Sequence, residues 1–338
     1  MAAYNDLKMM LNRIPDFIDF YKFGSIDVLR IVENSGFASY YDFLVKKDAD
    51  YSIRINNVAQ NMLSFVDKKL MHGKRIHELI ALKLIIEGET QIIQNLENII
   101  KKKLSENEIY NIKQVLQNKF IVSVNTAKTF KNAIFIDDNF NPSKSFLKEL
   151  EDENFKTLLI NSIEEGIRRN KLEYMYTYKD TNFVLNKKYG YEDVCKLLCW
   201  DSNMPALNIG GYRYDEKTNT FPVFINYDKE EDIRESINYH DHFLSENIFV
   251  GISKSNRKID SPEIKRLYDT SKQIKKYLFV RKNKEDASSK EFYFLGEIET
   301  IGNPVGMQLS KGIDVVEITY KLENPVREDL YDYIKGDI

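Results

Sequence analysis

Apolar residues recur at helical spacing along the first half of the chain. The segment NNVAQNMLSFVDKKLMHGKRIHELIALKLIIEGE places them three or four positions apart and is interrupted at Gly73 and Gly88. The stretches TQIIQNLENIIKKKL and SENEIYNIKQVLQNKF continue the pattern, and Ser105 with Glu108 has the spacing of a capping box. We therefore predict that residues 1–168 form a mainly helical domain.

The period of the pattern changes in KFIVSVNTAKTFKNAIFID, residues 119–137. The alternation there predicts two short strands around NTAKTFKN. A pair of helices followed by such a ribbon is typical of a winged helix, although this pattern also arises by chance. A winged helix is therefore one hypothesis for the end of the first half.

Residues 169–338 show mostly strand patterns. We predict a hairpin in ALNIGGYRYDEKTNTFPVFINYDKE and strands at NIFVGIS, YLFVRK, KEFYFLGEIETIG and GIDVVEITYKL. YGYEDVCKLLCW predicts a helix, and DSPEIKRLYDTSKQIKKYL predicts another, with Ser261 as N-cap and Pro262 in its first turn. The sequence thus predicts an α+β fold, with an all-helical N-terminal half followed by a mixed β-barrel domain with flanking helices.

Composition and missing motifs narrow the functional classes. The 338 residues carry a net charge of −3, so the whole chain is not a polycation that would coat nucleic acid. Its two cysteines, Cys195 and Cys199, supply half of a zinc site at most, and we expect buried free thiols in a reducing cytoplasm. The sequence shows no phosphate-binding loop, nucleophile elbow or zincin motif. It shows no signal peptide or membrane span either, so we expect a cytoplasmic protein without a membrane partner.

The stretch NYHDHF offers three interpretations. If it is extended, His240 and His242 face one side, and Tyr239, Asp241 and Phe243 face the other. The two histidines would suit zinc or iron in a metal-dependent hydrolase, given a third ligand from elsewhere. They would equally suit a solvated strand edge. On the other side, an acid between two aromatic rings would form the wall of a pocket, because the rings stack on a base and the carboxylate accepts the exocyclic amine of cytosine.

Two neighbouring segments bear on the third interpretation. Tyr212 and Tyr214 in the hairpin are candidates for the opposite wall of the pocket, although such residues more often fill a core. Residues 254–290 hold twelve Lys or Arg and five Asp or Glu, a local excess of basic charge. A run of lysines is usually a solvated face, but beside a base pocket it favours phosphate binding. The candidate phosphate-binding residues are Lys254, Arg257, Lys265, Lys272 and Lys276.

Several stretches resemble a known family. KYGYEDVCKLLCWD, NIGGYRYDEKTNTFPVFINYDKEEDIRESINYHDHFL and SKSNRKIDSPEI are similar to the C-terminal domain of bacterial superfamily II helicase-nucleases, namely the SauUSI-like, ATP-dependent type IV restriction endonucleases. LNRIPDFIDFYKFGSIDVLRIVENSGFASYYDFL resembles the helical segment that precedes that domain. In the family the NYHDHF stretch usually reads tyrosine, acid, Asp, any residue, Phe. Tyr239, Asp241 and Phe243 match, whereas His240 replaces the acid and the position of His242 is variable, which argues against a two-histidine metal site as a trait of the family.

The resemblance implies a fold and a function. The fold would be PUA/SRA-like, a barrel that flips 5-methylcytosine out of DNA, and it would occupy residues 169–338. Asp241 would read the Watson–Crick edge of the base, while Tyr239, Phe243, Tyr212, Tyr214 or Trp200 would stack on it or contact its methyl group. The family often has an aromatic residue near Val250 or Gly251, where this chain reads IFVGIS. The helical half, residues 1–168, would be a coupler.

The resulting hypothesis is that the chain is the target-recognition portion of a modification-dependent type IV restriction endonuclease. It would bind double-stranded DNA containing 5-methylcytosine, with 5-hydroxymethylcytosine and homodimerisation left open. We expect no catalytic residue, metal or cofactor in this chain, since ATP and Mg²⁺ would belong to the nuclease and helicase domains of a longer parent. The alternatives are a docking or oligomerisation module without base readout, and the metal-dependent hydrolase with His240 and His242.

Overall fold

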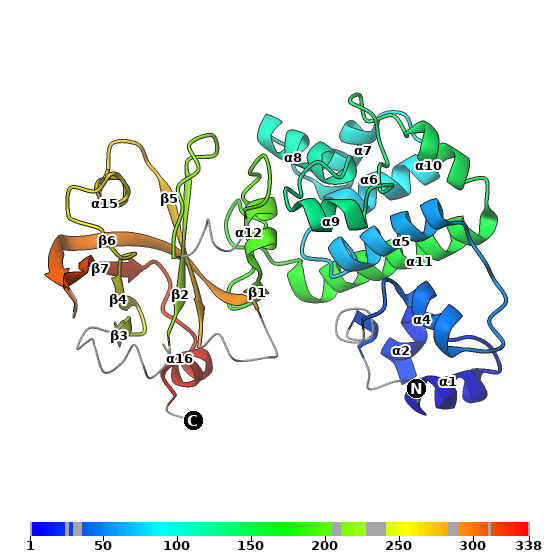
Figure 1. Cartoon of the computed structure of the whole chain (residues 1–338), viewed down its shortest axis with the longest axis horizontal. Coiled ribbons are helices and arrows are strands. Elements are labelled where there is room, and N and C mark those ends of the chain that lie inside the picture. The colour runs from blue at the N-terminus through cyan, green and yellow to red at the C-terminus, as the bar shows by residue number, and fades with distance from the viewer. Residues whose placement is uncertain are drawn as a thin grey trace. The chain divides into compact units, whose positions relative to one another are not determined.

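The structure of the chain is a computed structural model. It describes residues 2–23, 27–29, 36–204, 211–227, 241–282, 290–309 and 312–336. The chain divides into two compact units, Met1–Tyr176 and Thr177–Ile338, so the boundary lies eight residues beyond the predicted 168. The helical first half and the mixed sheet of the second half confirm the α+β class (Figure 1).

The first unit is built from helices joined by short connections. Their bounds are α1 Ala2–Leu11, α2 Phe17–Phe23, α4 Tyr40–Lys47, α5 Asn57–Lys69, α6 His77–Ile86, α7 Ile92–Ile100, α8 Glu106–Leu116, α9 Val124–Thr129, α10 Lys144–Glu149, α11 Glu153–Arg169 and the π-helical turn η1 Asn170–Tyr174. The long helix α11 packs along α5 and α6. The close approach depends on glycine, since a Cβ on Gly166 would lie 2.5 Å from the side chain of Leu79.

The ends of these helices follow the sequence signals. The predicted capping box of α8 is present: the Glu108 N–H donates to the Ser105 hydroxyl oxygen, and the Ser105 N–H donates to the Glu108 carboxylate. Asn56 caps α5 by accepting hydrogen bonds from two backbone N–H groups of the first turn. Helix α6 is buried on nearly every side, so it forms the centre of the unit.

The two strands predicted within residues 119–137 are wrong. That segment contains α9, and Ile136 makes only an isolated bridge to Pro142. Phe135, from the second predicted strand, instead fills the helical core, where it and Phe130 from the predicted connection both contact the ring of Phe65. The described residues of this segment therefore form no winged helix.

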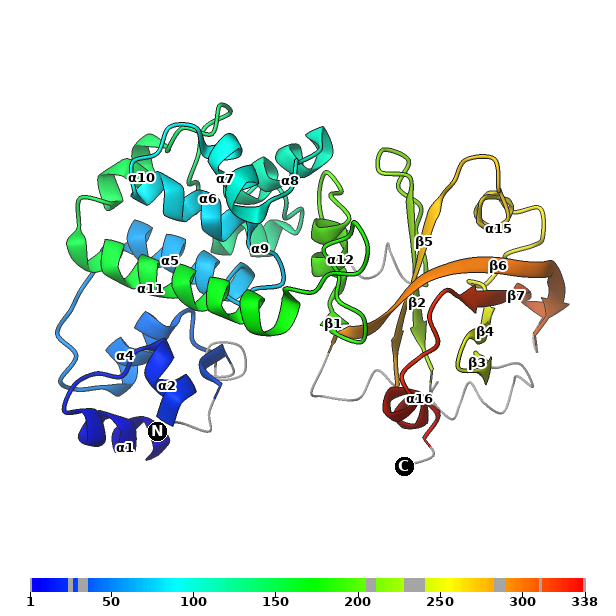
Figure 2. The same ribbon diagram turned by 180° about the vertical axis from the view of Figure 1, so that it is seen from behind.

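The second unit is organised around one mixed sheet. Its strands are β1 Lys188–Tyr189, β2 Thr220–Asn226, β3 His242–Ser245, β4 Ile248–Ile252, β5 Lys275–Arg281, β6 Phe292–Gln308 and β7 Asp314–Leu322. The order is β2-β5-β6-β7-β4-β3, and β1 pairs with β6 (Figure 2). Strands β2 and β5 are parallel, and the other pairs are antiparallel. In the predicted hairpin, β2 is the second arm, and the first arm meets it through antiparallel bridges.

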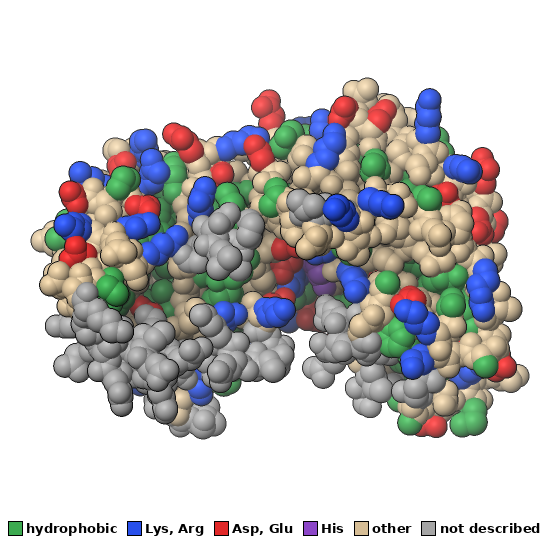
Figure 3. All heavy atoms as spheres, in the orientation of Figure 1, with side chains coloured by type: hydrophobic (Ala, Val, Ile, Leu, Met, Phe, Trp, Pro, Cys, Tyr) green, Lys and Arg blue, Asp and Glu red, His purple; other side chains and the backbone are tan. Residues whose placement is uncertain are grey.

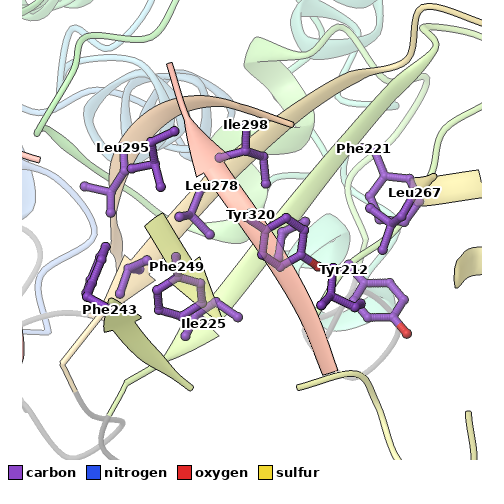
Figure 4. Packing of buried hydrophobic residues seen from close by; sticks show 14 of the residues in the cluster. Tyr212, Phe221, Ile225, Phe243, Phe249, Leu267, Leu278, Leu295, Ile298 and Tyr320 are labelled. Atoms are coloured by element: carbon purple, nitrogen blue, oxygen red, sulfur yellow. The ribbon is translucent and has the colours of Figure 1, made fainter. Parts of the chain in front are cut away.

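Strand β6 bends the sheet around its core. Its first part pairs with β5, and its second part pairs with β7 across an irregularity between Ile301 and Val305. The edge strand β2 approaches β4, which is next to the other edge strand, since a Cβ on Gly251 in β4 would lie 3.8 Å from the Cδ1 of Ile225 in β2. The core between them is apolar and includes Tyr320, Phe249 and Leu278 (Figure 4). The sheet thus forms a curved wall around one interior.

Three described helices flank this sheet: α12 Tyr191–Leu197, α15 Pro262–Leu267 and α16 Glu328–Lys335. Helix α12 confirms the prediction for that segment, and its Cys195 and neighbouring Cys199 are buried free thiols. Pro262 stands in the first turn of α15 as predicted. No helix in the described part of the chain has the length and apolar character that crossing a membrane requires.

The helix predicted over residues 260–278 ends eleven residues early, at Leu267. Asp269 then forms a turn by accepting the backbone N–H of Ser271, and Gln273 has a positive φ of 45°. Residues from Lys275 onward pair with β2 as strand β5. Pairing with β2 thus takes precedence over the helical pattern of this lysine-rich segment.

Candidate nucleic-acid interface

The acid of the NYHDHF stretch points inward from the start of β3. Asp241 is 5% exposed, and its Oδ1 accepts the backbone N–H of Ile252 at 2.7 Å. Phe243 is also buried, while His242 between them is half-buried. The predicted alternation therefore holds for these three residues. Tyr239 and His240 lie outside the described residues.

Phe243 is part of the apolar core. Its ring stacks on Tyr227 at a centroid distance of 5.9 Å. It meets the edges of Phe249 at 4.9 Å and Tyr331 at 5.3 Å. A ring enclosed by three others would have to displace one of them before a base could stack on it.

Tyr212 and Tyr214 lie together on the hairpin side of the interior. Both rings contact Phe221, at 5.7 and 6.1 Å. The Nζ of Lys254 stands 4.8 Å from the centroid of the Tyr212 ring, and the guanidinium of Arg266 stands 4.2 Å from that of Tyr214. The Tyr214 hydroxyl donates to Asn219, whereas the buried Tyr212 hydroxyl has no hydrogen-bond partner. Burial, above all, raises the pKa of Tyr212 to about 12.

Four polar side chains share the interior of the curved sheet: Asp241, Tyr212, Tyr268 and Tyr320, which we call the polar centre. Burial raises the pKa of the Tyr320 hydroxyl well above its ordinary value, and the nearby Tyr212, Tyr268 and Asp241 raise it further. Figure 4 shows Tyr320 between Phe243 on one side and Tyr212 on the other. The Tyr268 hydroxyl, like that of Tyr212, is buried without a hydrogen-bond partner. Such groups are uncommon in proteins and suit an ordered water or a ligand.

Trp200 stands apart from the polar centre. Its Nε1 donates to the Oγ1 of Thr220 at 2.9 Å. Residues alternate along β2, and Phe221 faces the interior core, so Thr220 and Trp200 lie on the opposite face of the sheet. The structure therefore does not bring Trp200 to the other predicted pocket residues.

A cavity of about 850 Å³ lies between α15, the loop before it and the ends of β6 and β7. We call it the α15 cavity. Its apolar walls include Ile259, Ile264 and Met307, and Tyr268 also lines it. The remaining polar lining comprises Arg257, Lys258, Asp260, Lys265, Asn303, Gln308 and Asp314. Its size and mixed lining are typical of ligand sites.

The five candidate phosphate-binding residues occupy different environments. Arg257 and Lys265 line the α15 cavity, and the Arg257 Nε donates to Glu263 at 3.2 Å. Lys265 and Lys272 are exposed, the first on α15 and the second in the turn after it. Lys276 is 9% exposed in β5, and burial lowers its pKa; burial also lowers the pKa of Lys254. A helix over residues 260–278 would place Lys265, Lys272 and Lys276 on one flank, but the helix ends before the latter two, so they share no flank.

The pattern reasoning missed three residues of the α15 cavity. Lys258 and Asn303 belong to no sequence motif for a site, and in a helix over residues 260–278 Tyr268 would fall on the apolar stripe. The pair Asn303-Pro304 interrupts an otherwise strand-like run, which is the one signal that could have marked the cavity.

The part of the described chain that is visible in Figure 3 carries no large patch of one charge. Lys and Arg side chains are interspersed there with Asp and Glu side chains. Within the residues that the structure describes, no three His, Cys, Asp or Glu side chains come together as metal ligands would. His242 belongs to that part of the chain, and His240 does not.

Comparisons with known proteins give two matches, both to families. The model of a domain of unknown function, DUF3427, matches residues 183–334, which is nearly all of the second unit. The model of a second domain of unknown function, DUF8090, matches residues 1–174. No curated protein matches the chain. Since the second match spans half of the chain, this protein belongs to the DUF8090 family and carries a DUF3427 domain after it.

Proposed function

We propose that the second unit binds duplex DNA and takes a 5-methylcytosine out of the helix, and that the chain is the target-recognition portion of a SauUSI-like, modification-dependent type IV restriction endonuclease. The observation that carries the proposal is the polar centre. A buried carboxylate and two tyrosine hydroxyls without hydrogen-bond partners lie inside a curved sheet, next to a basic-rimmed cavity. A PUA/SRA-like barrel would present its base-reading groups in this way.

The chemistry of the polar centre suits cytosine. Asp241 accepts hydrogen bonds, and the exocyclic amine of cytosine donates them. Tyrosine hydroxyls both donate and accept, so they can meet the carbonyl and ring nitrogen of the same base. We assign no stacking role to Phe243 or Trp200, because the first is enclosed by rings and the second lies on the other face of the sheet.

The energetics require more than recognition of a methyl group. Extruding a base costs a few kcal/mol, which pocket and phosphate contacts must offset. Burying one methyl group contributes about 1 kcal/mol, which corresponds to roughly a fivefold preference. A stronger preference therefore needs a pocket that excludes other bases sterically. For phosphate contacts we retain Arg257 and Lys265, which border the α15 cavity, and the exposed Lys272.

The first unit would then be a coupler. In the family that the sequence resembles, a nuclease and a helicase-type motor precede such a segment. We propose that the helices of the first unit connect those domains to the DNA-reading unit. ATP, Mg²⁺ and strand cleavage would belong to the parent protein, and this chain would bind DNA without catalysing a reaction.

Fluorescence polarisation tests the proposal directly. One labelled duplex, unmodified or with a single 5-methylcytosine, is titrated with the chain at fixed salt, with and without EDTA. We expect tighter binding to the methylated duplex and no effect of EDTA. Equal affinities would contradict base readout. Binding that EDTA abolishes would favour the metal site at His240 and His242, and no binding would favour a docking module.

A further inference from the structure

We infer that the α15 cavity receives the extruded nucleotide, and that the base turns its polar edge toward Tyr268 and the polar centre behind it. This inference rests on the proposed function. It differs from the sequence prediction, which placed the base against a wall formed by Asp241 and Phe243. Asp241 remains a member of the polar centre in both cases. What differs is the space that the base occupies and the side from which it reaches the polar centre.

Space decides between the two locations. The cavity measures about 850 Å³ and is open to solvent, and this volume lies within the range of small-molecule sites. It is large enough for a sugar and a phosphate in addition to a base. The side of Phe243 offers no comparable opening among the described residues, since its ring is closed in by Tyr227, Phe249 and Tyr331.

The lining of the cavity matches the parts of a nucleotide. Lys265 on α15 is exposed, and no ion pair is seen for it within the described chain, so it is available for phosphate. Lys258 stands at the rim, 3.5 Å from the carboxylate of Asp314, and 70% of its side chain is exposed. The amide of Asn303 offers the paired donor and acceptor that base edges require. The Gln308 amide offers its carbonyl oxygen, because its Nε2 donates to the Gly312 carbonyl at 3.4 Å and to Asp314 at 3.3 Å. Ile264 supplies an apolar wall for a base or a methyl group.

Tyr268 connects the cavity to the interior. Its ring lines the cavity and also packs against the apolar core that contains Tyr320. Its hydroxyl is buried without a hydrogen-bond partner. Tyr268 and Asp241 both raise the pKa of Tyr320, in addition to the effect of burial. Because the Tyr268 hydroxyl is buried, a base in the cavity would meet the remainder of the Tyr268 side chain first, with the hydroxyl and the rest of the polar centre behind it.

Gly306 keeps one wall of the cavity open. It lies in β6 opposite Val316, and a Cβ at this position would stand 3.5 Å from the Cδ1 of Ile259 across the cavity lining. A larger side chain would therefore enter the cavity without a backbone clash. The preceding Val305 is not among the residues that line the cavity and is 50% exposed, so it provides a matched control.

The test uses the same pair of duplexes with the full chain. We expect Gly306→Leu to abolish the preference for the methylated duplex, while affinity for unmodified DNA stays within about twofold because phosphate contacts supply nonspecific binding. Val305→Leu should keep the wild-type preference. Tyr268→Phe should lower the preference without loss of stability, because the hydroxyl that it removes has no partner.

The outcomes separate the two ideas. A wild-type chain without any preference for methylated DNA would contradict the proposed function itself. A wild-type preference that persists in both Gly306→Leu and Tyr268→Phe would overturn the assignment of the cavity and leave the proposed function standing. Loss of preference in Val305→Leu as well would also overturn it, since the effect would then not depend on the cavity. Thermal unfolding of each variant establishes that it is folded.

Discussion

The backbone N–H of Ile252 donates to the Oδ1 of Asp241 at 2.7 Å, so the last residue of β4 holds the carboxylate that precedes β3. An amide in place of the carboxylate would keep this acceptor. We therefore expect Asp241→Asn to remain folded, with a change in the free energy of unfolding of about 1 kcal/mol or less. Its affinity for methylated and unmodified duplexes should become equal, because the charged acceptor for the exocyclic amine is lost.

Fluorescence polarisation and urea unfolding together check this prediction. Glu246→Gln is the matched control, since Glu246 is an exposed acid in the turn between the same two strands. An Asp241→Asn variant that still prefers the methylated duplex would remove Asp241 from the reading of the base.

Two lysines should respond differently to charge reversal. Lys265→Glu, on the exposed side of α15, should weaken binding to every duplex and reduce the slope of log affinity against log salt by about one. Lys276→Glu should instead destabilise the second unit by roughly 1–3 kcal/mol, because it places a buried acid near Glu299 and Asp269. Titrations at three salt concentrations and urea unfolding separate these effects. An unchanged salt slope in Lys265→Glu would show that α15 does not contact phosphate.

Stability of the first unit should depend on pH through Asp67. Burial raises the pKa of this carboxyl to about 6, although it accepts hydrogen bonds from the Ser162 hydroxyl and the Tyr40 N–H. The ordinary value is near 3.9, so between about pH 4 and 6 the folded state holds a proton that the unfolded state has lost. Raising the pH through this window should therefore lower the free energy of unfolding, by an amount on the order of 3 kcal/mol.

Urea unfolding of the wild type and Asp67→Asn between pH 4 and 7 measures this contribution. The difference between the two proteins is the relevant quantity, because carboxyls with lowered pKa values, such as Asp48, make the opposite contribution as the pH falls. The stability of the wild type should decrease relative to the variant across the window. A constant difference would mean that Asp67 keeps an ordinary pKa.

Gly251 should tolerate no side chain. A Cβ there would lie 3.1 Å from the ring of Tyr320 and 3.3 Å from that of Phe249. We expect Gly251→Ala to destabilise the second unit by about 1–3 kcal/mol through overpacking. Gly306→Ala in β6 of the same sheet is the control, because the same Cβ there would meet only ordinary contacts. Equal stabilities in thermal unfolding would contradict the tight packing at Gly251.

The ring of Tyr320 from β7 fills the space beside Gly251 in β4. The sequence pattern predicts strand β7 itself. Its register against β4 depends on pairing between segments about 70 residues apart, which no local sequence pattern can predict.

Local patterns were sufficient where local energetics decide. Ser105 and Glu108 form their capping box within one turn, and the helices of the first half follow the spacing of their apolar residues. The patterns failed where tertiary pairing competes with them. Residues 268–278 have helical spacing, yet β2 draws Lys275 and its successors into a parallel strand. Phe135 belongs to a segment with a strand-like pattern but packs in a helical core against Phe65.

The candidate site was only partly accessible to sequence reasoning. The inward direction of Asp241 and Phe243 follows from strand alternation, which is a local property. The enclosure of Phe243 by Tyr331 and the position of Trp200 behind β2 depend on contacts between distant segments. The α15 cavity depends on three such segments meeting, so its lining could not be assembled from the sequence.

Strand β6 gives the second unit a property that can be followed by hydrogen exchange. Its 17 residues run from the pairing with β1 and β5 to the pairing with β7, so both parts of the sheet share one backbone. Opening either part requires breaking hydrogen bonds of the same strand, and the sheet should therefore exchange its slowest amides as a single cooperative unit. Occupancy of a site near Gly306 would then slow amide exchange as far away as Phe292, at the other end of that strand.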